Sequence, residues 1–245
     1  SWIVGDCCFN VGIGTTNPNV AVGVGNTAKL AVGILSAYQL YGDGSNLSGV
    51  GFNTDAQGNL YAGTEAGDSS DADTYYNIGL GECALHDNSA GDYLVGIGYK
   101  ALCKAVEGCH VAIGQEAGAS QTNGNHNVYI GACVASNTSC SNISNHNIGL
   151  GFSALKGVTS GSCNIALGYG ALQTPSTSHA NFAVGRNALS GSVTGNDNIA
   201  IGRCSTTGAL SGSNNIALGC QSALSKSSGA DNISIGRLAG KTAGT

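Results

Sequence analysis

Short apolar segments recur along this chain at an almost constant interval. The phrase Asn-Ile-Ala-Leu-Gly stands at residues 164–168 and again at 215–219, and near copies close on a glycine about every 17 residues. These repeat glycines are Gly81, Gly98, Gly114, Gly131, Gly151, Gly168, Gly185, Gly202, Gly219 and Gly236, with an earlier copy ending at Gly63. Such self-similarity predicts a solenoid in which each repeat forms one coil.

Within each copy, apolar and small residues alternate with the period of a β-strand. The third residue before the glycine and the residue just before it are Ile, Val, Leu or Phe. The residue between them is Gly, Ala or Ser, with Tyr129 the large exception in the regular copies. A period of two indicates a strand with one buried face. We expect the Ile and Leu columns to form the core, so that Asp at Ile165 or Leu167 would disrupt the stack.

The rest of each repeat is rich in Ser, Gly, Asn and Thr, which favour turns. A repeat of this length holds about two short strands and two turns, too little to bury a face alone. Stacked coils would place an Asn from each repeat in an amide ladder along the rod. A glycine in every coil indicates a left-handed or crowded backbone position. The predicted fold class is therefore all-β, a repeat β-solenoid or β-roll with coils of about 17 residues.

The small column suggests how such coils associate. A solvated outer face normally carries charged or polar side chains, whereas this column is small and uncharged. We expect it to lie on the outer face and to pack against sister chains around a common axis. The predicted state is an intertwined homotrimer.

The repeat divides the chain into three parts. Residues 1–55 are expected to form an N-terminal strand-rich connecting segment, because they contain Trp2 and the Cys7–Cys8 pair but lack the period. Residues 56–76 are a transition coil, and residues 77–245 are the regular rod. The longer interval between Gly131 and Gly151 predicts one bulging loop.

Composition narrows the classes of partner. Only 9% of the residues are charged, and the net charge is −5 without a basic patch, which argues against nucleic acid. No apolar run approaches the roughly 20 residues of a membrane span, so membrane insertion is not expected. No catalytic triad, metal-protease motif or phosphate loop accompanies the five histidines, and we expect neither an enzyme nor a cofactor.

Two columns carry candidate chemistry. Aromatic and arginine side chains suited to recognising a receptor follow the repeat glycine at Tyr99, Phe152, Tyr169, Arg186, Arg203 and Arg237. These residues could equally be rim residues that keep a charge-poor rod soluble. Five residues before the glycine stand Cys109, His126, His146 and Cys163, which could bind a metal or could line a solvated turn. The ten cysteines are expected to be reduced, with local Cys103–Cys109 and Cys133–Cys140 bridges as the oxidised alternative.

These repeats resemble a known family. The form Asn-Ile-Ala-Ile-Gly-x-x-Ala-Leu is similar to the repeats of phage tail fibres, cyanophage fibres among them, and of the β-roll heads of trimeric autotransporter adhesins. The segments at residues 10–18 and 37–50 resemble phrases of phage fibre and structural proteins. The coil is longer than in the adhesin heads, and nothing after Gly240 resembles the self-cleaving chaperone of such fibres.

The resemblance implies a function and a place. It implies a homotrimeric fibre in the virion, extracellular once assembled, that attaches the particle to the host surface. The implied partners are the chain's own copies, other tail or fibre proteins, and a host surface glycan or protein. The alternatives are a structural spacer or filament subunit without its own receptor site, and a bacterial trimeric adhesin head.

Overall fold

A computed structural model of the protein describes residues 3–5, 11–13, 54–137, 143–174, 177–223 and 228–240. The chain divides into two compact units, Ser1–Gly49 and Val50–Thr245. In the first unit, β1 (Ile3–Gly5) pairs antiparallel with β2 (Val11–Ile13). The rest of the predicted connecting segment up to residue 53 lies outside the described residues.

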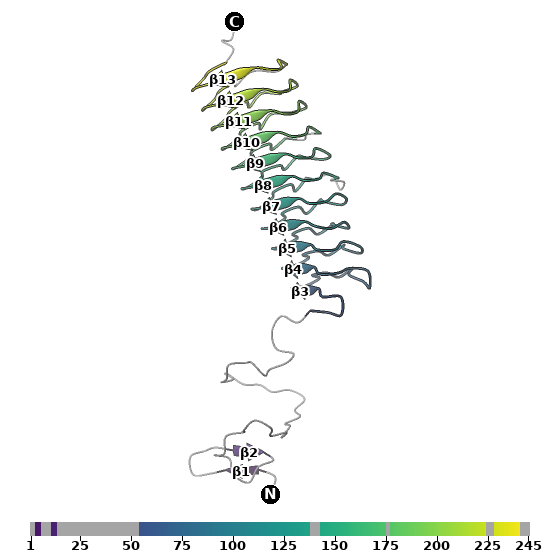
Figure 1. Ribbon diagram of the computed structural model, residues 1–245. Helices are drawn as coiled ribbons and strands as arrows, with labels where there is room; N and C mark the ends of the chain where they lie inside the picture. Colours follow the sequence, from purple (N-terminus) through teal and green to yellow (C-terminus); the bar gives the residue numbers. More distant parts are fainter. Residues whose placement is uncertain are drawn as a thin grey trace, which may run out of the picture. The chain divides into compact units, whose positions relative to one another are not determined.

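The second unit is a parallel β-solenoid, which confirms the predicted all-β repeat fold. Its strands stack one above another in chain order to form a single sheet of 11 strands (Figure 1). They are β3 (Leu60–Ala62), β4 (Ile78–Leu80), β5 (Val95–Ile97), β6 (Val111–Ile113), β7 (Val128–Ile130), β8 (Ile148–Leu150), β9 (Ile165–Leu167), β10 (Phe182–Val184), β11 (Ile199–Ile201), β12 (Ile216–Leu218) and β13 (Ile233–Ile235). Equivalent residues pair directly, as Ala166 does with Ala183.

Each coil contains one strand rather than the predicted two. The strand is three residues long, and the described remainder of each coil is turn, bend and irregular backbone, with an isolated bridge such as Val193–Leu210 in places. β3 is already a rung of the sheet, so the first coil lies within the predicted transition at residues 56–76. In the described part of the chain, no helix has the length and apolarity needed to cross a membrane.

The prediction of which strand face is buried was wrong. The middle residue of each strand lies inside the coil: Ala166, Ala183 and Ala200 are completely buried. The flanking side chains of Ile165 and Leu167 point away from the coil interior and are only partly buried. The small column therefore cannot be the outer surface that meets sister chains.

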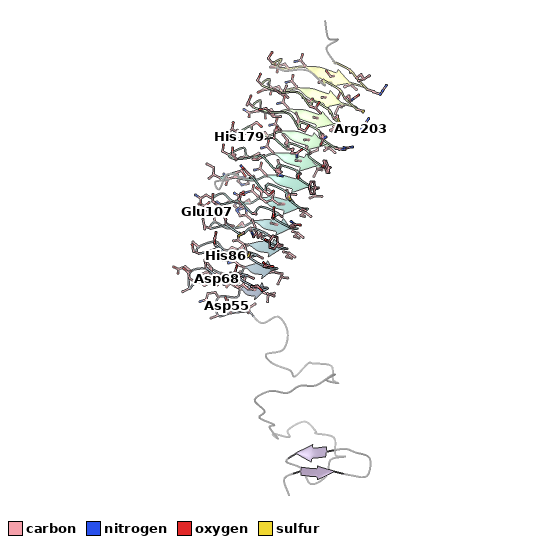
Figure 2. The ribbon with its side chains drawn as sticks, turned by 180° about the vertical axis from the view of Figure 1, so that it is seen from behind. Asp55, Asp68, His86, Glu107, His179 and Arg203 are labelled. Carbon is pink, nitrogen blue, oxygen red and sulfur yellow. The ribbon has the colours of Figure 1, made fainter. Side chains whose placement is uncertain are left out.

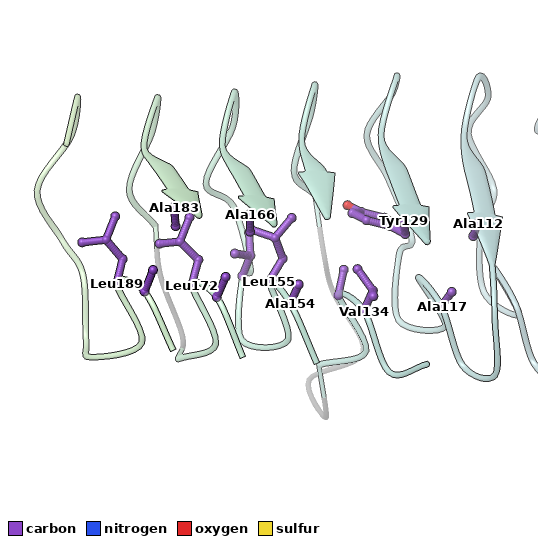
Figure 3. Packing of buried hydrophobic residues seen from close by; sticks show 14 of the residues in the cluster. Ala112, Ala117, Tyr129, Val134, Ala154, Leu155, Ala166, Leu172, Ala183 and Leu189 are labelled. Atoms are coloured by element: carbon purple, nitrogen blue, oxygen red, sulfur yellow. The ribbon is translucent and has the colours of Figure 1, made fainter. Parts of the chain in front are cut away.

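The core is built from small and large residues that face each other across the coil. Ala and Leu, three and four residues after the repeat glycine, lie opposite the small column (Figure 3). Leu155, Leu172 and Leu189 are no more than 1% exposed. The interior is too narrow for Leu on one wall and Ile on the other, so the bulkier strand side chains lie outside.

Tyr129 shows that the two walls of a coil share a fixed side-chain volume. Its ring occupies a small-residue position yet is only 1% exposed, and its hydroxyl donates to Gln121 Oε1 at 3.1 Å. The Leu that usually stands opposite is replaced by Gly118, where an added Cβ would lie 2.9 Å from the Tyr129 ring. Tyr61 and Gly67 repeat this exchange in the first coil. A large residue on one wall is matched by a glycine on the other.

The amide ladder is confirmed by hydrogen bonds between coils. The backbone N–H of Asn164 donates to Oδ1 of Asn147 at 2.8 Å, and Asn181 N–H donates to Asn164 Oδ1 at 3.0 Å. The same bond recurs at Asn198, Asn215 and Asn232. Nearly all of these side chains are buried, so the ladder satisfies backbone groups that water cannot reach.

The repeat glycines are required by both conformation and space. Gly202 has a φ of +132°, and a Cβ there would lie 2.5 Å from the carbonyl oxygen of Gly219 in the next coil. The same geometry recurs along the stack, which confirms the predicted crowded, left-handed position. The bulge predicted between Gly131 and Gly151 falls largely on residues 138–142, outside the described residues.

Candidate functional site

The outer side of the sheet carries an uninterrupted apolar surface. We call it the apolar face, made of the first and third side chains of β4–β13. These are all Ile, Val, Leu or Phe, without a charged or polar residue. These side chains are exposed or only partly buried in the chain, with exposed fractions of 38% for Ile113 and 41% for Leu150. Monomeric soluble proteins rarely leave a continuous apolar surface of this extent uncovered.

The aromatic and arginine residues predicted after the repeat glycine do form a ladder at one margin of this face. Phe152 and Tyr169 stack with ring centroids 5.3 Å apart, and Cζ of Arg186 lies 5.7 Å from the Tyr169 ring. Arg203 follows in the next coil, where its Nη2 lies 3.6 Å from Cys220 Sγ. All are exposed, as are the two remaining candidates, Tyr99 and Arg237.

The six candidates do not form one continuous surface. Gln115 and Ala132 occupy the equivalent positions between Tyr99 and Phe152, and Cys220 separates Arg203 from Arg237. Tyr99 instead lies beside Lys100, whose Nζ is 5.1 Å from the ring centroid. We therefore call Phe152, Tyr169, Arg186 and Arg203 the aromatic–arginine ladder.

A second ladder lies before the strands and contains the predicted metal residues. His126 and His146 stack with parallel rings, 5.1 Å apart, and both Cys109 and Cys163 are exposed. The four residues thus lie in successive coils, as expected. Within the described chain, however, they form no group of three donor atoms within 4.8 Å of one another.

The same column contains an aromatic pair that sequence analysis did not single out as part of a site. Tyr76 stacks on Tyr93 with centroids 5.5 Å apart, and both are close to 60% exposed. Tyr93 also lines a shallow hollow of about 750 Å³, together with Asp92, Glu107 and Cys109. The signal was present in the column, since two successive coils place Tyr where the next four place Cys or His.

The cysteines that the structure describes are free thiols. Cys103 and Cys109 are not bonded to each other, and Cys133 is free, while Cys140 lies outside the described residues. Burial raises the pKa of the Cys103 thiol, and the Asp87 carboxylate adds to this effect. The hydrogen bond from His86 to Asp87 raises the pKa of that imidazole. His86, Asp87 and Cys103 lie close together, a grouping that sequence analysis did not identify.

No model of a protein family matches this chain, and neither a curated protein nor a solved structure matches it significantly. Its function must therefore be argued from these surfaces.

Proposed function

We propose that the chain forms the rod of a homotrimeric fibre that attaches a virion to the surface of its host cell. The observation that carries the proposal is the apolar face. Water contact along this face is unfavourable: an outer side chain of β6, β7, β8 or β11 that is 36–41% exposed has about 0.5–1.2 kcal/mol still to gain from burial.

The occupant that fits this face is another copy of the same chain. A partner must present apolar groups at the spacing of the coils over ten successive strands, from β4 to β13. A second solenoid has that spacing by construction. Three copies around one axis would bury their apolar faces together in a closed assembly.

The aromatic–arginine ladder is the proposed receptor surface. Its exposed rings can stack on sugar rings, and its guanidinium groups can pair with acidic sugars or with carboxylates of a surface protein. The ladder borders the apolar face, so in a trimer it would lie along the outer edge of each seam between chains. Its rings would then remain accessible to a ligand approaching from outside.

The oligomeric mass tests the proposed trimer, and binding to host cells tests the proposed attachment. We expect light scattering under native conditions to give three times the chain mass of 24.2 kDa. The purified trimer should compete with virions for host cells. Tyr169→Ala and Arg186→Ala should each weaken that binding by about fivefold or more without changing the mass or the melting temperature.

Tyr76→Ala is the matched control, because it removes an equally exposed tyrosine at the other margin of the sheet. A monomer in solution would contradict the trimer. Unchanged cell binding after substitution of the whole ladder would leave the rod a spacer between other binding parts.

A further inference from the structure

A second group of reactive side chains lies in the first three coils, in the turn that follows each strand. Two residues after the repeat glycine stand Glu65 and Cys83, and five residues after it stand Asp68, His86 and Cys103. The coils stack in register here, since Cys83 N–H donates to Thr64 O at 2.9 Å and Asp87 N–H donates to Cys103 O at 2.8 Å. The fold therefore brings thiol, imidazole and carboxylate groups together from three successive coils.

The distances within this group are short. One donor atom each from His86, Asp87 and Cys103 lies within 4.8 Å of the other two. The imidazole has a carboxylate on both sides, because its Nδ1 lies 2.5 Å from Asp87 Oδ1 and its Nε2 lies 3.9 Å from Glu65 Oε2. Cys83 Sγ adds a second thiol, 3.3 Å from the same Glu65 oxygen.

These separations are close to those of a tetrahedral metal site. Two ligands about 2.2 Å from a zinc ion are about 3.6 Å apart. The donor atoms of His86, Asp87 and Cys103 lie within 4.8 Å of one another, so movements of about 1 Å would bring them to that spacing. The side chains of His86 and Asp87 are 30% and 47% exposed, so both have room to rotate.

We propose that His86, Asp87 and Cys103 bind a divalent zinc-like cation, with water in the fourth position. A thiolate and an imidazole select zinc over calcium or magnesium, which prefer oxygen ligands. The cation would replace the His86–Asp87 hydrogen bond and displace the protons of His86 and Cys103. It would link two successive coils through side chains, in addition to the backbone bonds between them.

This site is separate from the proposed attachment surface. Asp68 and His86 lie at the opposite side of the stack from Arg203 (Figure 2). A trimer that covers the apolar face would therefore leave the cluster accessible to a metal. The metal proposal does not depend on the proposed function, and each can fail without the other.

Cobalt spectroscopy of the full chain provides the test. The reduced protein is freed of metal, titrated with Co²⁺ and then with Zn²⁺, and monitored for the thiolate-to-cobalt charge-transfer band. We expect a band that Zn²⁺ removes. Cys103→Ser should abolish the band, and His86→Ala and Asp87→Asn should each weaken binding by about tenfold or more.

Three variants act as controls in the same fold. Cys204→Ser removes a partly buried cysteine from a distant coil and should leave binding unchanged. The double variant His126→Gln, His146→Gln should also bind normally. Cys83→Ser tests the neighbouring thiol and should retain the charge-transfer band.

Several results would overturn the proposal. A band that survives Cys103→Ser but disappears with Cys83→Ser would refute the assigned ligand set. Loss of binding only in the His126 and His146 double variant would place the metal at the other ladder. Equal Co²⁺ binding by the wild type, His86→Ala and Cys103→Ser proteins would show that no site exists here.

Discussion

Substituting two neighbouring residues of β9 tests which strand face lies inside the coil. Ala166 is completely buried and is surrounded by apolar side chains of the core, whereas Leu167 is only partly buried. Aspartate at position 166 would place a carboxylate where no partner exists. Complete burial disfavours the charged form by about 4–7 kcal/mol, and since the carboxyl can instead take up a proton, the loss of stability at neutral pH is about 4 kcal/mol.

Aspartate at position 167 should behave differently. In a chain that is not associated with other copies, the substitution removes a partly buried leucine, which lowers the free energy of unfolding by about 1–2 kcal/mol. Its main effect should be on association, because it places charges on the face proposed to pack against other copies. We expect Leu167→Asp to yield a folded chain of monomeric mass and Ala166→Asp to lose its coil structure.

Urea unfolding followed by circular dichroism, with light scattering at each concentration, measures both effects. Ala166→Asn is the matched control, because it has the size of aspartate without the charge. The buried carboxyl has a higher pKa in the folded than in the unfolded protein, so its penalty grows as the pH rises above the unfolded value. The stability difference between the Asp and Asn variants should therefore shrink in acid. A larger loss of stability for Leu167→Asp than for Ala166→Asp, measured where both proteins are monomeric, would refute the assignment of residue 166 to the coil interior.

Three further predictions concern residues inside the solenoid. Burial lowers the pKa of His110 to about 4 from its usual 6.5, so the stability that neutral His110 contributes should be lost as the pH falls from about 6.5 towards 4. His110→Asn should remove that dependence, worth up to about 3 kcal/mol, in melts recorded across this range. Gly202→Ala should lower the unfolding free energy by about 1–3 kcal/mol or more, because it combines positive-φ strain with a backbone clash. An unchanged melting temperature would contradict the crowding of the repeat glycines. Gly118→Leu should destabilise the coil and Tyr129→Ala should rescue it, with a coupling of about 1–3 kcal/mol in a double-mutant cycle; additive effects would contradict the exchange of volume between the two walls.

Much of the fold could be predicted from the sequence because the period of a solenoid is written directly into it. The interval between glycines predicts the coil, and a buried Asn at a fixed position predicts an amide ladder such as that of Asn164 and Asn181. Both features depend on identity and spacing alone. They do not require knowledge of which direction a side chain points.

The buried face could not be predicted in the same way. Alternation separates Ile165 and Leu167 from Ala166, but it does not show which set is inside when neither set is polar. The width of the coil decides this, and width depends on the opposite wall. The matched pairs Tyr61–Gly67 and Tyr129–Gly118 contained the necessary information, since only facing residues exchange volume.

Candidate sites were harder to find because each depends on a ladder that spans several coils. The aromatic–arginine ladder lies in one column and was therefore visible in the sequence, as was its interruption after Tyr99 by Gln115 and Ala132. The cluster at His86 combines two columns, with Glu65 two residues and Cys103 five residues after a repeat glycine. Only the turn geometry brings those columns close to the same imidazole.

The His86 cluster and the aromatic–arginine ladder lie in different coils, so the two proposals can be tested separately. The His86 cluster belongs to the coils that follow β3, β4 and β5, whereas the aromatic–arginine ladder follows β8 to β11. Coils in a solenoid interact mainly with their nearest neighbours, so a change in one group should reach the other only weakly. Metal binding should therefore stabilise the first coils without altering cell attachment, and Tyr169→Ala should leave the cobalt band intact. If metal binding altered cell attachment, or if Tyr169→Ala altered the cobalt band, the rod would behave as one cooperative body. Contacts between chains would then have to transmit the effect, because contacts between successive coils transmit it only weakly.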